Sequence, residues 1–128
     1  MEGLPPFEQA ALDKLLAGNH PVLAALRTQA KAGRLSSREL TGVGFYCDFE
    51  VPPTVSPVGD ENFHLGDVEA TVPGLKHGAG FVLFVTNGRL TQLEGYSYDE
   101  PWPEEIHDFE LRYQHEPRRL EFPHLAAE

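Results

Sequence analysis

The sequence predicts an α+β protein in which an N-terminal αα-hairpin packs on a mainly antiparallel sheet of about five strands. Three observations predict this fold class. Hydrophobic residues recur every three to four positions near the N-terminus and every second position from residue 43 onward. Eleven prolines and twelve glycines cluster between these intervals and mark the turns. Strands that follow two helices and are joined by short turns are typical of an antiparallel sheet.

Residues 7–32 form the predicted helical hairpin. Phe7, Ala11 and Leu15 lie four residues apart and give the first helix one apolar stripe. Pro21 suits the first position of a second helix, and Gly33 is suited to end it. We expect the hairpin to cover a sheet formed by residues 43–114, with 115–128 as a tail of the same single domain.

Four intervals after the helical hairpin predict strands. Residues 43–51 alternate between hydrophobic and polar side chains, which is typical of a half-buried strand, and 67–72 repeat the alternation. Residues 81–85 are hydrophobic on both faces, as in a central strand. Residues 108–114 form the predicted last strand. In the first of these strands, the side chains expected to point into the core are Val43, Phe45, Cys47, Phe49 and Val51.

A tight hairpin is predicted at Asn87-Gly88, because this pair readily adopts the two positive φ angles of a type I′ turn. A two-residue loop would determine the pairing of the flanking strands. The expected pairs are Val85 with Leu90, Phe84 with Thr91, Leu83 with Gln92, Val82 with Leu93 and Phe81 with Glu94. Glu94 would then lie beside Phe81, among hydrophobic neighbours, in a shallow polar groove lined by tyrosines. The alternative is that this face is simply the solvated side of the sheet, with Tyr46, Asp48 and Glu50 next to it.

Charge and hydropathy argue against two classes of protein, those that bind nucleic acid and those that span a membrane. Ten Lys and Arg residues against twenty Asp and Glu residues give a net charge of −10, which opposes binding to nucleic acid. The longest strictly apolar run, 81–85, is far shorter than the roughly twenty residues of a membrane-spanning helix. The N-terminus does not resemble a signal peptide, and a single cysteine, Cys47, cannot form an internal disulfide. We therefore expect a cytoplasmic protein that binds neither nucleic acid nor membrane.

A candidate binding surface follows the predicted hairpin. Trp102 lies between two prolines and several acidic residues, and tryptophan and tyrosine are frequent anchors of interfaces. The predicted binding residues are Glu94, Tyr96, Tyr98, Asp99, Glu100 and Trp102. Their charge favours a basic protein as the partner of a non-enzymatic, regulatory or toxin-neutralising protein. The alternative is that Trp102 folds over the sheet edge as a lid on the core, while the acidic residues are only solvated.

Two other functions use the same residues. Glu94 could act as a general acid or base beside Tyr96 and Tyr46 in a weak enzyme, or the aromatic side chains could enclose a small organic cation. No cofactor or metal is expected, because Asp60, Glu61 and His64 in the long connection 52–66 show no paired metal-ligand spacing.

An open sheet edge near the last strand would allow two copies to pair as a homodimer.

Two motifs carry a resemblance to a known family. Residues 38–46 read RELTGVGFY, and residues 93–103 read LEGYSYDEPWP. Together they resemble motifs shared by a family of small uncharacterised bacterial proteins over about residues 35–105. This resemblance implies a bacterial, cytoplasmic source. It implies no catalytic residue or cofactor, although some members of such families are suspected immunity proteins that neutralise a toxin.

Overall fold

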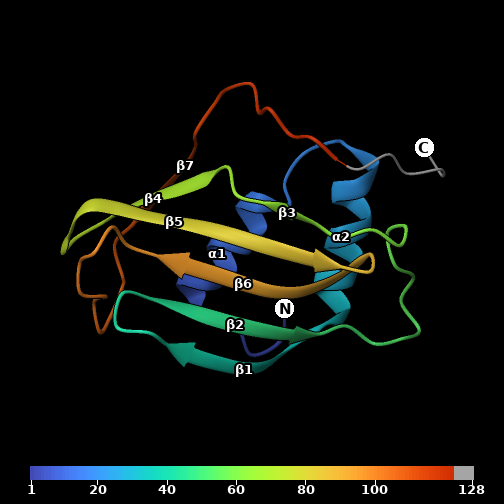
Figure 1. Ribbon diagram of the computed structural model, residues 1–128, viewed down its shortest axis with the longest axis horizontal. Helices are drawn as coiled ribbons and strands as arrows, with labels where there is room; N and C mark the ends of the chain where they lie inside the picture. The colour runs from blue at the N-terminus through green and yellow to red at the C-terminus, as the bar shows by residue number, and fades with distance from the viewer. Residues whose placement is uncertain (123–128) are drawn as a thin grey trace.

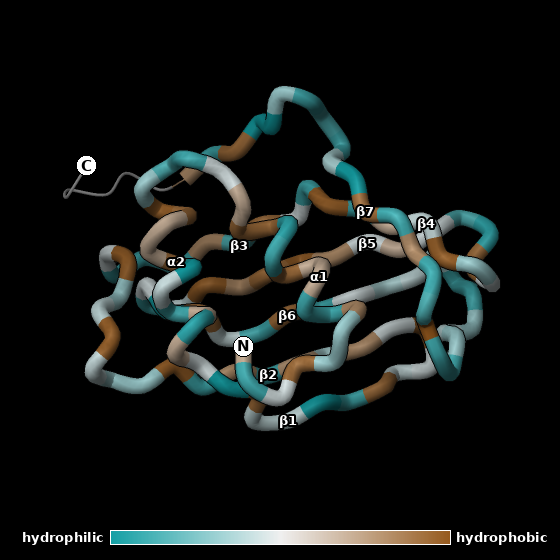
Figure 2. The backbone as a smooth tube through the Cα atoms, turned by 180° about the vertical axis from the view of Figure 1, so that it is seen from behind, coloured by the Kyte–Doolittle hydropathy of each residue, from teal (hydrophilic) through white to brown (hydrophobic). Residues whose placement is uncertain are grey.

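A computed structural model of the protein describes residues 1–122. Two helices precede a seven-stranded, antiparallel sheet with the strand order β1-β2-β6-β5-β4-β7, and β3 pairs with β5 beside β4. Both helices lie behind the sheet in Figure 1 and in front of it in Figure 2. The elements are α1 (Pro6–Leu15), α2 (Pro21–Ala32), β1 (Arg34–Leu40), β2 (Gly44–Glu50), β3 (Phe63–Leu65), β4 (Val68–Val72), β5 (Leu75–Thr86), β6 (Arg89–Tyr96) and β7 (Glu110–Tyr113). The predicted α+β class is confirmed, with seven strands in place of five.

The helices begin where the sequence predicts them. Pro21 occupies the first position of α2, and the Nδ1 atom of His20 accepts a hydrogen bond of 3.1 Å from the backbone N–H of Val22. This bond satisfies one of the N–H groups that a helix start leaves free. Neither helix within residues 1–122 has the length and hydrophobicity to cross a membrane.

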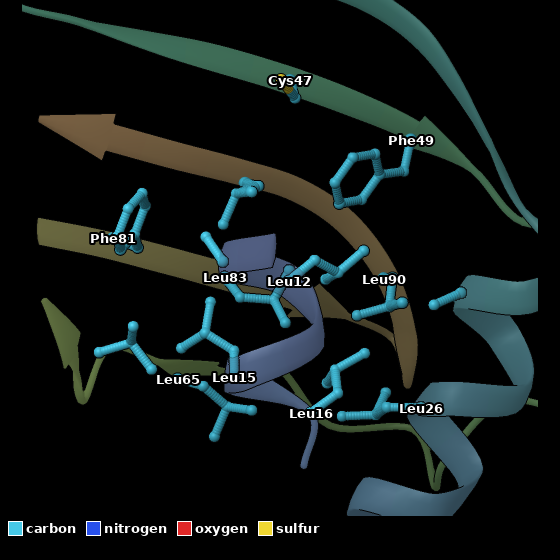
Figure 3. Close-up of a cluster of buried hydrophobic side chains, with 14 of the residues drawn as sticks. Leu12, Leu15, Leu16, Leu26, Cys47, Phe49, Leu65, Phe81, Leu83 and Leu90 are labelled. Atoms are coloured by element: carbon cyan, nitrogen blue, oxygen red, sulfur yellow. The ribbon is translucent and has the colours of Figure 1, made fainter. Parts of the chain in front are cut away.

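The core lies between the helices and one face of the sheet. Figure 3 shows Leu12 and Leu15 of α1 and Leu26 of α2 pointing toward Leu83 and the neighbouring strands. All four leucines are fully buried. Burial of such side chains contributes about 1.5–3 kcal/mol each to folding, so this layer is the main source of stability.

A buried glutamine connects α2 to the β5–β6 hairpin. The Nε2 atom of Gln29 donates a hydrogen bond of 2.8 Å to the carbonyl oxygen of Gly88, and its Oε1 atom accepts one of 2.9 Å from the N–H of Leu90. The turn itself has the predicted conformation, because Asn87 and Gly88 have φ angles of 52° and 76°. Gly88 is required for a second reason: a Cβ atom there would lie 2.3 Å from the carbonyl oxygen of Gly59.

The hairpin register differs from the prediction beyond the first pair. Val85 pairs with Leu90 as expected, but a β-bulge at Thr91 shifts the following pairs by one residue. The bulge allows both Leu90 and Leu93 to point into the core, where they are 1% and 0% exposed. Strict alternation would have placed one of them on the opposite face. The observed pairs are Phe84 with Gln92, Leu83 with Leu93, Val82 with Glu94, and Phe81 with Gly95.

The prediction missed two strands and misplaced the bounds of others. Strand β1 was missed because it is an edge strand with mostly exposed residues, so its alternation is weak. Strand β3 has only three residues and lies within 52–66, which was predicted to be entirely a loop. Strand β5 starts at Leu75 rather than Phe81, because Gly78 and Gly80 are accommodated within it. Val43 was predicted to be in the core, but it lies in the β1–β2 turn and is 45% exposed.

The described part of the predicted tail 115–128 packs against the body of the protein. Both terminal nitrogens and Nε of Arg118 form hydrogen bonds, reaching the carboxylate of Asp67 at 2.7 Å and the carbonyl oxygens of Leu15 and Ala17 at the end of α1. The guanidinium also lies 4.3 Å from the ring centre of Tyr113. Arg118 therefore joins the C-terminal segment to α1 and β4. Residues 123–128 of the predicted tail lie outside the described residues.

Candidate functional site

The face of the sheet that points away from the helices is the first candidate surface, which we call the open face. Its central residues come from β2, β6 and β5, and the antiparallel pairing of β2 with β6 places Tyr46 opposite Glu94 and Asp48 opposite Gln92. Tyr96 follows on β6 and pairs with Gly44. Figure 1 shows this face toward the viewer, with both helices on the far side. The central residues of the open face are Tyr46, Asp48, Val82, Phe84, Gln92, Glu94 and Tyr96, and all are partly exposed.

Glu94 occupies this face and not the hydrophobic position that the predicted register gave it. It pairs with Val82 on β5 instead of Phe81, and with Tyr46 on β2. Hydrogen bonding to the Glu94 carboxylate raises the pKa of the Tyr46 hydroxyl above its usual 10.0, and the negative charge of Glu94 adds to the rise. Tyr46 therefore remains a neutral hydrogen-bond donor beside a carboxylate at physiological pH.

Two tyrosines form an aromatic pair at one end of the open face. The ring of Tyr96 lies over Gly80, where a Cβ atom would come within 2.5 Å of it. Tyr98 packs edge-on against Tyr96, with 5.7 Å between the ring centres, and is 49% exposed. Burial raises the pKa of Tyr96, and Tyr98 adds to that rise. The two rings thus present a rigid aromatic surface next to Glu94.

Hydrogen bonds hold Asp48 in the middle of the open face. Its two carboxylate oxygens accept bonds of 2.8 Å, one from the hydroxyl of Ser37 on β1 and one from the side-chain amide of Gln92 on β6. Both donors are uncharged, so neither forms an ion pair with the carboxylate. The bonds orient it without neutralising it.

The charge of the open face is negative. Arg34 and Arg112 lie on this face, but each forms an ion pair with a carboxylate there, Glu50 and Glu69 respectively. The carboxylates of Glu39, Asp48 and Glu94 have no ion-pair partner among residues 1–122. They leave a local excess of negative charge beside the tyrosines.

Asp99 and Glu100, two of the predicted binding residues, belong to the loop 97–109, which follows β6. Both carboxylate oxygens of Glu100 accept backbone hydrogen bonds, of 2.7 Å from Lys76 and 2.8 Å from His77. These bonds stabilise the charged form and lower the pKa of Glu100. Asp99 is exposed and has a positive φ angle of 63°. Glu100 thus anchors the loop to the start of β5.

Trp102 lies on the helix-covered side, away from the open face. Its ring is 5.7 Å from that of Phe45 and 6.2 Å from that of Phe7, both of which belong to the core. Its backbone N–H donates a hydrogen bond of 2.8 Å to the carbonyl oxygen of Gly42 in the β1–β2 turn, beside which the loop lies in Figure 1. This packing corresponds to the alternative expectation for Trp102. The structure therefore brings Glu94, Tyr96 and Tyr98 together and separates Trp102 from them.

Glu8 and Arg38 form a second polar group, which the sequence patterns did not predict. Glu8 is only 2% exposed, and the Nε atom of Arg38 donates a hydrogen bond of 2.7 Å to it. The sequence contained a sign that Glu8 is buried. Glu8 lies four residues before Leu12 and eight before Leu16, and this spacing places it on the apolar side of α1. Its partner is thirty residues away in the chain, and no local pattern identifies it.

Groups suited to metal or nucleophilic chemistry are sparse among residues 1–122. No cluster of three or more His, Cys, Asp or Glu side chains there is arranged to hold a metal ion. Cys47 is fully buried, and burial raises the pKa of its thiol to about 12, so it is protonated at neutral pH.

No family model, curated protein or solved structure showed significant similarity to the chain.

Proposed function

We propose that this protein is a non-enzymatic binding module whose open face docks a basic protein partner, in a regulatory or toxin-neutralising role. The observation that carries the proposal is the negatively charged, tyrosine-lined face that the helices leave uncovered. Asp48 and Glu94 lie at its centre without a basic partner among residues 1–122. A partner that carries lysine or arginine side chains would supply the missing positive charge.

The aromatic and hydrophobic side chains supply the contact area for such a partner. Tyr96 and Tyr98 offer large surfaces and lose few rotatable bonds on binding, and tyrosine is enriched at binding hot spots. Val82 and Phe84 form a partly exposed hydrophobic floor between the polar residues. Charge would steer the partner to this face, and the tyrosines would provide most of the contact.

The same features disfavour two other uses of this face. Two copies that paired through it would bring like charges together, which opposes a homodimer through the open face but not one through the edge strand β7. An acid or base catalyst works best in an enclosed site that excludes water. Glu94 and Tyr96 are both partly exposed on the face of the sheet, and neither lines any of the four clefts that lie around Phe49, His64, Trp102 and Arg27 among residues 1–122.

The test uses a synthetic twelve-residue peptide rich in lysine, arginine and aromatic residues, with an acidic peptide of the same length as its control. Backbone amide NMR shifts of the full chain should change at Tyr46, Asp48, Glu94 and Tyr96 with the basic peptide only. Affinity should fall at least about tenfold when the ionic strength rises from 0.05 to 0.5 M, since salt screens exposed charges.

A charge-matched pair of variants makes the test specific. The double variant Asp48→Asn/Glu94→Gln should weaken binding about fivefold, because each exposed charge pair contributes about 0.2–1 kcal/mol. The control Asp13→Asn/Glu121→Gln removes the same charge from exposed positions in α1 and in the C-terminal segment and should leave the affinity within about twofold. Equal weakening by both variants, or shifts confined to other surfaces, would contradict the proposal.

A further inference from the structure

A cleft of about 300 Å³ lies at the opposite side of the sheet, where the start of α1, the end of β1 and the loop 97–109 meet. Its hydrophobic lining includes Trp102, Ile106 and Phe109, which are partly buried, and Leu40, which is 60% exposed. The polar lining residues are Glu8 and Arg38 and the exposed Glu104 and His107. A hydrophobic cleft with a few convergent polar groups is the usual form of a small-ligand site.

Glu8 and Arg38 form an ion pair that leaves one polar atom of each partner without a bond to oxygen or nitrogen. Both Nε and Nη2 of Arg38 reach the same oxygen of Glu8, Oε1, at 2.7 and 2.5 Å. Neither the Oε2 atom of Glu8 nor the Nη1 atom of Arg38 bonds an oxygen or nitrogen among residues 1–122, and the other side-chain neighbour of Arg38 is the thiol of Cys47. No buried side-chain oxygen or nitrogen in that range lacks a hydrogen-bond partner, so Oε2 is accessible to solvent, and Glu8 is a lining residue of the cleft.

Stability alone does not account for this pair. The side chain of Glu8 is 3% exposed and that of Arg38 is 33% exposed, so the carboxylate has lost nearly all of its water. Replacing a buried ion pair by hydrophobic residues of similar volume is often neutral or stabilising. An acceptor and a donor kept at the base of a hydrophobic cleft are, in contrast, what recognition of a polar ligand requires.

The chemistry of the pair indicates the class of ligand. Its net charge is zero, so a charged ligand would attract one partner and repel the other. An uncharged carboxamide matches both, because its N–H can donate to Oε2 of Glu8 while its carbonyl accepts from Nη1 of Arg38. A volume of about 300 Å³ is at the lower end for ligand pockets and suits one ring or one branched side chain beside Trp102.

We propose that this cleft binds a carboxamide attached to an aromatic or branched aliphatic group. The carboxamide belongs either to a free small molecule or to a hydrophobic residue of a peptide. The site is independent of the open face, since its residues point to the helix-covered side of the sheet.

Trp102 is the only tryptophan of the chain and reports directly on the cleft. Fluorescence of the full-length protein should change on titration with benzamide, with a dissociation constant on the order of millimolar for so small a compound. Benzoate and benzylammonium have the same ring but carry a charge, and both should bind at least tenfold more weakly. N-acetylphenylalaninamide distinguishes the two sources: binding at least tenfold tighter than that of benzamide assigns a peptide residue, and equal or weaker binding assigns a free amide.

The role of the ion pair is tested by its effect on the relative affinities for charged benzoate and uncharged benzamide. Glu8→Gln leaves the Arg38 charge uncompensated, so the ratio of benzoate to benzamide affinity should rise at least tenfold. A variant that had merely lost its fold could not gain affinity for benzoate. Arg38→Lys keeps the charge but removes the forked donor, and it should weaken benzamide binding about tenfold. The control Tyr46→Phe, on the open face, should change neither affinity.

The proposal is overturned if Trp102 fluorescence responds to none of these compounds. It is equally overturned if benzamide and benzoate bind alike to the wild type and to Glu8→Gln, because the cleft would then select only for a hydrophobic ring. Melting curves and far-UV circular dichroism establish that each variant is folded before its affinities are compared.

Discussion

Cys47 illustrates at the scale of one residue how burial determines chemistry. It alternates with Phe45 and Phe49 on the core side of β2 and is 0% exposed. Burial is the main cause that raises the pKa of the thiol from 9.0 to about 12, and the nearby Glu8 carboxylate adds to it. Because the pKa is higher in the folded state, this group stabilises the fold fully below pH 9, and the contribution is lost as the pH rises from 9 toward 12.

We therefore expect Cys47 to be unreactive in the native protein. The thiolate is the nucleophile, and at pH 8 almost none is present or accessible. Ellman's reagent should label less than about one tenth of the thiol in an hour in buffer and all of it within minutes in 6 M urea. Free N-acetylcysteine under both conditions is the control for the reagent. Fast, complete labelling of the native protein would show that β2 opens readily.

At the scale of an element, the β5–β6 hairpin depends on Gln29 of α2. The Gln29 side chain is 0% exposed, and it satisfies the carbonyl of Gly88 and the N–H of Leu90 at the turn. Replacement by leucine would leave the N–H of Leu90 buried without a partner, whereas the carbonyl oxygen of Gly88 would keep its 2.7 Å bond from the N–H of Val58. One such unpaired group costs about 1–3 kcal/mol, so we expect Gln29→Leu to lower the free energy of unfolding by about 2 kcal/mol.

Urea denaturation measures this loss, and hydrogen exchange locates it. The amide of Leu90 should exchange at least tenfold faster in Gln29→Leu than in the wild type. The matched control is Gln9→Leu on α1, whose side chain bonds only the exposed Asp13, and its stability should change by less than about 0.5 kcal/mol. A Gln29→Leu variant as stable as this control would show that the hairpin does not need the helix.

At the scale of the whole molecule, the loop 97–109 links the two candidate sites. It carries Tyr98 beside the open face and Trp102 at the wall of the cleft. Glu100, between them, ties the loop to β5 through the N–H groups of Lys76 and His77. The ionised carboxylate of Glu100 therefore holds in place the loop that carries these two aromatic residues.

This dependence predicts an effect of pH. The pKa of Glu100 is lower in the folded state than its usual 4.5, so its contribution to stability is present above pH 4.5 and is lost as the pH falls through the folded value. Glu100→Gln should thus melt at a lower temperature than the wild type at pH 7, and the difference should shrink below pH 4.5. Asp108→Asn, at an exposed position of the same loop, is the control. A difference that is constant with pH would contradict the role of the carboxylate.

Local sequence patterns were sufficient for the elements whose signals lie within a few residues. The helices begin at Pro6 and Pro21, and the turn at Asn87-Gly88 has the two positive φ angles that its residues favour. The same patterns failed for β1, because an exposed edge strand needs no hydrophobic alternation, and for β3, because it is too short to show any. Leu90 and Leu93, three residues apart, were a sign of the bulge that the predicted register overlooked.

What the sequence determined by itself was therefore the fold class and the presence of an acidic, tyrosine-bearing strand. Only the tertiary structure decided that Glu94 faces solvent beside Tyr46, that Trp102 lies on the other side of the sheet, and that Arg38 pairs with Glu8. The physical reason is the separation in the chain of the residues that interact. Turn and helix preferences act between neighbours in the chain, whereas these three contacts join residues that are thirty or more positions apart and depend on the packing of the whole core.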